Sequence, residues 1–414
     1  MKILIDIRLL GRERQSGVAE YTFNIVDHLI KLAPPNFRFQ LFYNGLKKEP
    51  LPEHWLTAPN TYIINSRYPN KIFNVASFVN LPIDKFIKTD LIFSPHIDLL
   101  SHNSTPRILT VHDLSFLHYK HFFSRKQRLW HYFQKIKKQV AQANHIIANS
   151  EYTKKDIMET LGISENKISV IYPGIGIPNK ITEAGSSLSE RIVPASTLAR
   201  VAFLPVGPTT QESWADKKAY SEPPVVAGRE RGMTAGGFIL YLGTLEPRKN
   251  IPAIIKAFNI IKSTNKYPDL KLVLAGRPGW LYKDIVKEAR RSPYRQEIIF
   301  WGLATVAEKN MLYNSARAFI YPSFFEGFGF PPLEAQANGC PVIISNRSSL
   351  SEIMGDSALK INPWRTDQLA TAIDQILSDQ TLRKKLIAAG RENIKKFNWQ
   401  LCAQKLLKIF SGYC

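Results

Sequence analysis

The chain is poor in cysteine and has no long apolar runs. Its three cysteines, Cys340, Cys402 and Cys414, are too few for a disulfide framework or a zinc site, which favours a reducing, cytoplasmic setting. No apolar run approaches the roughly 18 residues that a membrane-spanning helix needs. Because Asp6 interrupts the apolar start, we expect no signal peptide, and any membrane contact is expected at the surface.

The sequence also lacks the residue patterns that hold metal ions. No two Asp residues are separated by a single position, and no His, Cys and carboxylate cluster has metal-ligand spacing. Acidic residues are outnumbered 34 to 55 by Lys and Arg, which gives a formal charge of +21. This excess favours anionic partners such as nucleotide phosphates, acidic lipids or nucleic acid, without choosing among them.

What is present indicates two α/β domains, because 414 residues exceed what one core usually supports. Short apolar runs alternate with helix-like segments, the pattern of parallel sheets covered on both faces. The runs span 3–7, 39–43, 91–94, 108–112, 145–149 and 168–172, then 238–242, 271–275, 297–301, 318–321 and 341–345. We therefore predict two doubly wound, Rossmann-like domains over residues 1–178 and 238–396.

The stretch between these domains has a different composition. Residues 179–237 are rich in Ser, Pro, Gly, Thr and Arg and show little periodicity. A long structureless loop is unusual inside a compact domain, so this stretch is predicted to be a flexible insert or linker without chemistry of its own.

A basic turn follows the first strand of the second domain. Residues 243–250 read GTLEPRKN, and a helix is predicted to start near Ile251. Open parallel sheets bind ligands at the carboxyl ends of their strands, beside helix N-termini that attract phosphate. Arg248 and Lys249 are therefore candidates to neutralise a diphosphate without a metal. A solvated turn is the plainer alternative, and these eight residues alone do not separate the two.

A second candidate stretch follows the predicted strand 318–321 and leads into a helix. Its two glycines allow backbone N–H groups to approach a ligand, and a carboxylate expected in the first helical turn could accept from sugar or ribose hydroxyls. The candidate ligand-binding positions are Gly327, Phe328, Gly329, Leu333 and Glu334.

Glu326 lies on the loop of the same stretch. Its carboxylate could hold sugar hydroxyls or stabilise an oxocarbenium-like transition state. Helix capping would explain Glu334, but it gives no reason for Glu326 or for the neighbouring glycines. We therefore consider Glu326 a candidate catalytic residue.

Together these stretches resemble the group 1, or family 4, retaining glycosyltransferases of the GT-B fold. That family carries two Glu residues separated by seven, as Glu326 and Glu334 are here, and a phosphate-binding turn similar to 243–250. The resemblance covers both domains outside the insert and implies an α/β fold whose two Rossmann-like domains face a central cleft. It also implies that residues 397–414 form a C-terminal helix that crosses back toward the first domain.

Further motifs match the family in order, at 16–21, 110–114, 148–153 and 170–174. The resemblance assigns Gly17 to a glycine-rich loop near the donor phosphates and His112 to contact with the transferred sugar. Many relatives have a glycine pair where this chain has Ser16 and Gly17, so Gly17 is the safer assignment. A lone His is more often structural, but the carboxyl end of a strand favours a role at a site.

The activity that the resemblance implies is transfer of a hexosyl unit, with retention, from a nucleoside diphosphate sugar to a hydroxyl of a glycan or lipid-linked acceptor in cell-surface polysaccharide synthesis. Similarity to bacterial mannosyltransferases at residues 5–8 and 243–250 makes GDP-mannose the leading donor, while glucosyl, rhamnosyl and N-acetylhexosaminyl transfer stay open. Arg248 and Lys249 would replace a metal, and no cofactor is expected.

Two rivals come from other classes of protein. A sugar-nucleotide 2-epimerase can share this architecture but would bring different acid and base residues. A nucleic-acid-binding protein would suit the charge, yet no helix-turn-helix, zinc or aromatic RNA-binding motif is recognisable, and we expect no nucleic acid partner.

A basic, aromatic segment suggests contact with an anionic membrane. Residues 124–140 are predicted to be one helix, with Leu129, Phe133, Ile136 and Val140 in an apolar stripe beside a basic face. Such a face is usually only solvated. Relatives that glycosylate lipid-linked acceptors dock through a basic patch of their first domain, which implies a place at the inner face of the cell membrane.

Overall fold

The computed structural model describes residues 1–11, 16–45, 51–68, 75, 77–176 and 237–413. Its contacts divide the chain into two compact units. The first comprises Met1–Ile175, Glu326–Phe328 and Lys396–Cys414, and the second comprises Gly176–Phe325 and Gly329–Lys395. The predicted insert at 179–237 lies outside the described residues except for its last residue.

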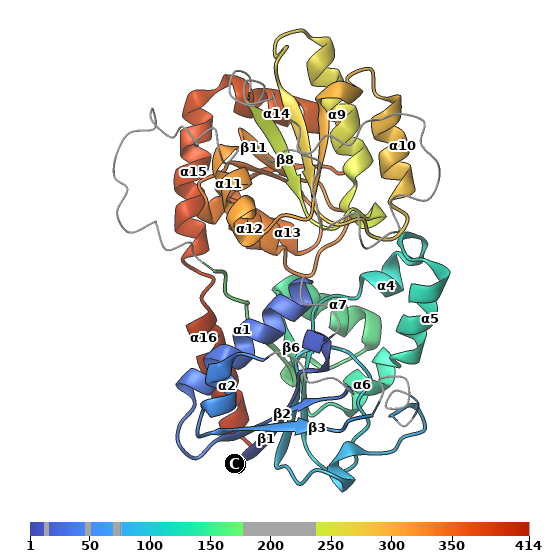
Figure 1. The fold of residues 1–414 in the computed structure, drawn as a ribbon, viewed down its shortest axis with the longest axis vertical. Coiled ribbons are helices and arrows are strands. Elements are labelled where there is room, and N and C mark those ends of the chain that lie inside the picture. Colours follow the sequence, from blue (N-terminus) through green and yellow to red (C-terminus); the bar gives the residue numbers. More distant parts are fainter. Residues whose placement is uncertain (12–15, 46–50, 69–74, 76, 177–236, 414) are drawn as a thin grey trace. The chain divides into compact units, whose positions relative to one another are not determined.

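Within its described residues, the first unit contains a seven-stranded parallel sheet of order β3-β2-β1-β4-β5-β6-β7 (Figure 1). The direction of strand addition reverses between β1 and β4, so their carboxyl ends form the switch point at which such sheets bind ligands. The strands are β1 (Lys2–Asp6), β2 (Arg38–Tyr43), β3 (Thr61–Asn65), β4 (Leu91–Ser94), β5 (Arg107–Val111), β6 (His145–Ala148) and β7 (Ile168–Val170).

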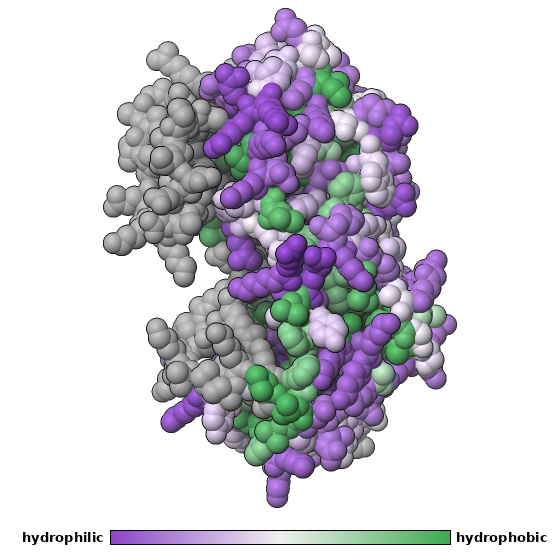
Figure 2. All heavy atoms as spheres, turned by 90° about the vertical axis from the view of Figure 1, so that its right-hand side faces the viewer, coloured by the Kyte–Doolittle hydropathy of each residue, from purple (hydrophilic) through white to green (hydrophobic). Residues whose placement is uncertain are grey.

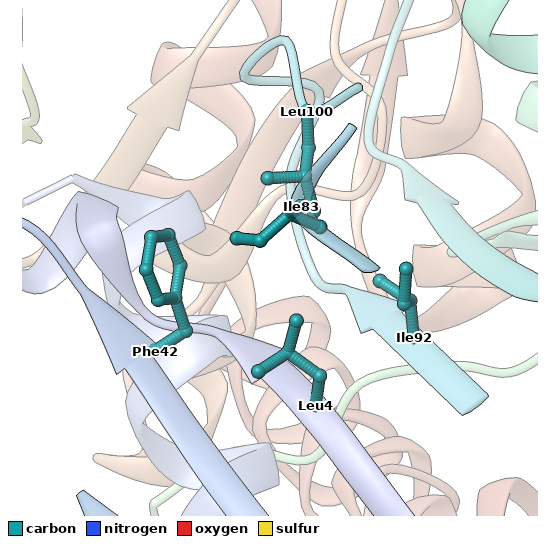
Figure 3. Close-up of a cluster of buried hydrophobic side chains, with 5 residues drawn as sticks. All are labelled: Leu4, Phe42, Ile83, Ile92 and Leu100. Atoms are coloured by element: carbon teal, nitrogen blue, oxygen red, sulfur yellow. The ribbon is translucent and has the colours of Figure 1, made fainter. Parts of the chain in front are cut away.

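Helices cover this sheet through buried apolar side chains. One cluster joins β1, β2 and β4 to the chain beside them and consists of Leu4, Phe42, Ile83, Ile92 and Leu100 (Figure 3). The helices are α1 (Gly17–Leu32), α2 (Glu53–Thr57), α4 (Ser115–His118), α5 (Arg125–Phe133), α6 (Ile136–Gln142), α7 (Glu151–Leu161) and α16 (Trp399–Ser411).

The C-terminal helix α16 packs on α1, the helix that opens the fold. The ring centroids of Tyr21 and Trp399 lie 5.8 Å apart, and both side chains are buried. Gly174 passes so close that a Cβ there would lie 2.2 Å from Trp399 N, so position 174 requires glycine. Two segments far apart in the sequence are thereby fixed together within the first unit.

The second unit contains a parallel sheet of order β10-β9-β8-β11-β12-β13, whose switch point lies between β8 and β11. The strands are β8 (Phe238–Leu242), β9 (Lys271–Ala275), β10 (Ile298–Gly302), β11 (Ala318–Tyr321), β12 (Val342–Ser345) and β13 (Leu359–Ile361). The helices are α9 (Ile251–Ser263), α10 (Lys283–Arg291), α11 (Val306–Ser315), α12 (Phe330–Ala337), α13 (Ser349–Met354), α14 (Thr366–Ser378) and α15 (Gln380–Ile394).

The structure differs from the sequence predictions in two edge strands and in one helix of the first unit, besides the position of Glu334 described below. The short edge strands β3 and β13 were not predicted; β13 has only three residues, and in β3 only Thr61 is buried. The single helix predicted over 124–140 is wrong, because Lys135 adopts a left-handed φ of 49° and separates α5 from α6. Among the described residues, no helix is long and apolar enough to cross a membrane.

Candidate active site

The switch point of the second sheet brings the two predicted stretches together, because β8 and β11 are hydrogen-bonded neighbours. The backbone N–H of Phe324 donates to Arg248 O at 2.9 Å, and Arg248 Nη1 donates to Phe325 O at 2.9 Å. The side chain and the carbonyl of Arg248 therefore hold the peptide groups that immediately precede Glu326.

Arg248 and Lys249 are both engaged by neighbouring side chains. Arg248 Nη2 donates to Glu246 Oε1 at 2.9 Å, and the two side chains are 14% and 4% exposed. Lys249 Nζ donates to the hydroxyl of Tyr321 at 2.6 Å and is itself buried. The alternative of a merely solvated turn is therefore wrong, whereas diphosphate binding by these cations stays a prediction.

The turn itself forms as the sequence predicts. A short 3-10 turn, Pro247–Lys249, ends at Asn250, whose left-handed φ of 56° redirects the chain into α9. Asn250 Nδ2 donates to Pro363 O at 2.7 Å, which fixes the turn from the opposite side. The helix predicted to start near Ile251 begins at that residue.

Gly329 precedes α12 with a positive φ of 100°, where a Cβ would lie 2.6 Å from Leu350 Cδ2. Glycine is therefore required at the entry to this helix. Pro331 and Pro332 carry no N–H, so the backbone donors between Phe328 and Leu333 are those of Phe328, Gly329, Phe330 and Leu333.

Glu334 lies one turn further into α12 than expected, since the helix begins at Phe330. Its carboxylate accepts from Lys309 Nζ at 2.7 Å and from the hydroxyl of Tyr313 at 2.8 Å. Burial, together with this carboxylate, raises the pKa of Tyr313, so the phenol stays a proton donor. Sequence reasoning missed both partners, although their i, i+4 spacing on α11 puts them on one helix face.

In the first unit, His112 follows β5 directly, and its Nε2 lies 2.7 Å from Pro95 O. A carbonyl accepts only, so Nε2 carries the proton and Nδ1 is the acceptor of the neutral ring. Burial lowers the pKa of His112 to about 4, although the hydrogen bond to Pro95 opposes this shift. The ring packs edge-on against Tyr21, with centroids 4.7 Å apart.

Within the first unit, Gly327 lies against the backbone of His112. A Cβ at position 327 would come within 1.7 Å of His112 O, so no larger residue fits. The carbonyl of Gly327 accepts from Ser150 Oγ at 2.8 Å and from Thr153 Oγ1 at 3.3 Å. Two predicted site positions, Gly327 and His112, are therefore neighbours, and Glu326 is the residue next to them in the chain.

Gly17 is the first residue of α1 and is exposed. Ser16 is the N-cap of this helix, and its Oγ accepts from Ala19 N at 3.2 Å. Its φ of −98° is open to any residue, so replacement of a glycine by Ser16 places no strain on the backbone. The loop before it, residues 12–15, lies outside the described residues.

The sequence analysis did not predict a buried ion pair between Asp6, the last residue of β1, and Arg8. Arg8 Nη2 lies 2.7 Å from Asp6 Oδ2, and both side chains are fully buried. Burial opposes ionisation of Asp6, but the charge of Arg8 outweighs it and holds the pKa of this carboxyl well below its usual range. The spacing Asp-x-Arg at the end of an apolar strand was the available signal.

Comparison with known proteins defines first the fold and then the family. The crystal structure of Anabaena Alr3699/HepE in complex with UDP and glucose aligns with a TM-score of 0.66 and 16% identity, over 100% of both chains. The chain has the GT-B fold, as predicted. The family model described as "Glycosyl transferases group 1" matches residues 234–393, and that described as "Glycosyltransferase Family 4" matches residues 15–177. The chain belongs to the group 1, family 4 glycosyltransferases.

Two relatives from Escherichia coli are similar over parts of the chain. The O-antigen chain mannosyltransferase B is 36% identical over 176 residues, which is 42% of this chain and 45% of the relative. The serotype-specific mannosyltransferase WbdA is 30% identical over 194 residues, which is 46% of this chain and 24% of the relative. The matched segment thus spans less than half the length of each relative.

Proposed function

We propose that the chain is a retaining hexosyltransferase that uses a nucleoside diphosphate sugar and a hydroxyl acceptor on a glycan or lipid-linked glycan. The observation that carries the proposal is the switch point of the second sheet. There Arg248 and Lys249 immediately precede the N-terminus of α9, and Arg248 holds the peptide groups of the loop leading to Glu326. Phosphate favours such a helix N-terminus, and both cations lie beside it.

In this mechanism the chain's own groups take on the charge of the departing diphosphate. Arg248, Lys249 and the backbone N–H groups from Phe328 to Leu333 bind the phosphate oxygens, and the family resemblance assigns Gly17 to the same role. Glu326 and neutral His112 orient the transferred sugar. Glu334, oriented by Lys309 and Tyr313, accepts from the ribose hydroxyls.

We propose GDP-mannose as the donor and cell-surface polysaccharide synthesis as the setting, supported by the names of the two relatives. A thermal-shift screen of GDP-, UDP-, ADP- and dTDP-sugars tests this choice, since a ligand bound only by the folded state raises the apparent Tm. Among these sugar nucleotides, GDP-mannose should give the largest increase in Tm. A separate assay should then detect transfer of labelled mannose from GDP-mannose to an acceptor. A larger Tm shift with another sugar nucleotide would identify that compound, instead of GDP-mannose, as the donor.

The reaction is proposed to need no metal, because Arg248 and Lys249 already supply two positive charges for the phosphates. Activity should therefore persist in excess EDTA. Loss in EDTA with recovery on adding Mg²⁺ or Mn²⁺ would contradict this part of the proposal.

We further propose that α5 contacts the anionic lipids at the inner face of the cell membrane. None of its residues is buried, and Leu129 and Tyr132 are 56% and 74% exposed. Figure 2 faces the side on which α5 lies in Figure 1 and shows hydrophobic side chains among strongly hydrophilic ones. Exposed apolar groups beside Arg125 and Arg128 suit a surface that inserts between acidic headgroups.

Co-sedimentation with vesicles tests this contact. Binding should require anionic lipid and should fall when Leu129 and Tyr132 are both replaced by Ser, with no change in donor affinity. The pair Lys283→Ser and Lys287→Ser on α10 is a control with two substitutions on another helix. Equal binding to neutral vesicles would contradict an electrostatic contribution.

Other results of ligand-binding and transfer experiments would favour one of the two rival functions. Conversion of the sugar nucleotide without transfer to an acceptor would favour a 2-epimerase, which the relatives do not favour. Salt-dependent binding to duplex nucleic acid that is tighter than binding to nucleoside diphosphates would favour the other rival.

A further inference from the structure

The loop that follows β4, residues 95–100, is held by two buried glutamines from the α5–α6 region. Gln139 Nε2 donates to Ile97 O at 2.7 Å, and Gln134 Oε1 accepts from Leu99 N at 2.8 Å. Both glutamines are almost fully buried, at 2% and 6% exposure. A buried amide group is costly unless each of its polar atoms is paired, so these contacts are specific.

Two buried arginines hold the same loop from the sheet. Arg107 Nη1 donates to Leu100 O at 3.1 Å, and Arg8 Nη2 donates to Asp98 O at 3.3 Å and Leu99 O at 3.2 Å. Every backbone carbonyl from residue 97 to residue 100 thus has a side-chain donor. A loop bound at this density has little freedom to shift.

Gln139 connects these two sets of contacts. Its Oε1 accepts from Arg107 Nη2 at 2.8 Å while its Nε2 donates to Ile97 O. An amide is needed here, because it is both an acceptor for a guanidinium and a donor to a carbonyl. A carboxylate would keep the first contact and lose the second.

The anchored loop begins with the carbonyl that orients His112. Pro95 O accepts from His112 Nε2 at 2.7 Å, and Pro95 lies two residues before Ile97. We propose that Gln139 is a positioning residue that fixes the Pro95 carbonyl and thereby the tautomer and orientation of His112. This inference rests on the proposed function only for its kinetic consequence.

Nitrogen-15 NMR of the histidine rings tests the positioning directly. The chain has nine histidines, and the signal of His112 is identified by its loss in His112→Gln. The wild-type ring should be a single neutral tautomer with the proton on Nε2. Gln139→Leu should give a mixture of Nε2–H and Nδ1–H forms, because the loop that carries the Pro95 carbonyl loses its contact at Ile97 and the acceptor that orients Arg107. Gln142→Leu, at an exposed position of the same helix, should leave the signals unchanged.

If Gln139→Leu does not fold, Gln139→Glu provides the same test, since it keeps an acceptor for Arg107. A folded Gln139 variant that retains the wild-type ring signals of His112 would overturn the proposal. In transfer assays kcat should fall on the order of tenfold to a hundredfold through misplacement of His112. Donor affinity should stay within about twofold. A wild-type protein without transferase activity would contradict the proposed function but leave the NMR test decisive.

Discussion

The switch points of the two sheets differ in the side chains that they hold. All nine histidines lie before residue 150, in the first unit, and none lies between residues 238 and 395. The first edge positions neutral His112 through a backbone carbonyl and encloses its ion pair, Asp6 with Arg8. The second edge holds charged side chains beside hydrogen-bonding partners, and Arg248, paired with Glu246, keeps 14% of its side chain exposed.

Under the proposed function, this difference separates two tasks, orientation of the sugar and binding of the diphosphate. A neutral imidazole suits orientation of an uncharged sugar, because it adds no charge of its own near the sugar hydroxyls. An edge with oriented cations suits an arriving diphosphate, since the charges are already in place and need little reorganisation. The following predictions test the comparison in order of decreasing effect.

The largest effect is expected at Glu326. Glu326→Ala should lower kcat by about 10²–10³-fold or more, because a group aimed at transition-state charge is lost, while donor binding is largely kept. Transfer of labelled sugar and calorimetric donor affinity measure the two effects. Glu159→Ala, which removes an exposed partner of Lys155, should change neither. Near-normal turnover in Glu326→Ala would show that the assignment is wrong.

The next effect concerns the pH dependence of stability. His112 has a pKa of about 4 in the folded protein, against about 6.5 when unfolded. The unfolded chain alone binds this proton within that window, so the free energy of unfolding falls as the pH drops from 6.5 to 4. Replacement by Gln should remove up to about 3 kcal/mol of this loss.

Denaturant unfolding of the wild type and His112→Gln at pH 7 and pH 4.5 measures this difference. Replacement of exposed Gln142 by Leu, at a side chain without an ionisable group, is the control and should leave the slope with pH unchanged. Parallel slopes for the wild type and His112→Gln would mean that the imidazole is accessible to protons in the folded state.

A smaller effect is expected at Lys249. Lys249→Ala should weaken GDP binding roughly tenfold to a hundredfold, the usual range for a hydrogen bond to a charged group. Tyr321→Phe keeps the ring but removes the hydroxyl that accepts from Lys249, so it should weaken binding by about tenfold or less. Calorimetry with GDP measures both. Equal affinities of Lys249→Ala and the wild type would remove Lys249 from the proposed diphosphate site.

The smallest effect is expected at the start of α1. Ser16→Ala should lower the free energy of unfolding by about 1 kcal/mol, because the N-cap acceptor is lost, whereas Ser16→Gly should cost only a few tenths. Urea unfolding midpoints measure both, with Ser164→Ala as a control at a serine whose side chain caps no helix. Equal midpoints for Ser16→Ala and Ser16→Gly would show that the cap contributes little.

The sequence predicted the central strands of both sheets because they are continuous apolar runs. Strands β4, β8, β9 and β11 have the predicted bounds. The break in 124–140 could not be predicted, because the left-handed Lys135 is stabilised by tertiary contacts such as the hydrogen bond from Lys135 Nζ to Phe78 O. Long-range packing decides such positions and local periodicity does not.

The same distinction applies to the candidate site. Arg248, Lys249 and Glu334 stand in local motifs, so the sequence reveals them. Their partners Tyr321, Lys309 and Tyr313 are ordinary residues of a strand and a helix, and only the folded chain brings them into contact. The roles of the motif residues stay predictions until the variants are measured.

Ser16 has a consequence for how such chains are recognised. The family resemblance would allow a glycine pair here, as in many relatives, yet the backbone is extended and the Ser16 hydroxyl caps the helix. A search pattern that demands two glycines would reject this chain for a reason that its backbone does not impose. A pattern written as a small capping residue followed by glycine would keep it and describe the physical requirement more closely.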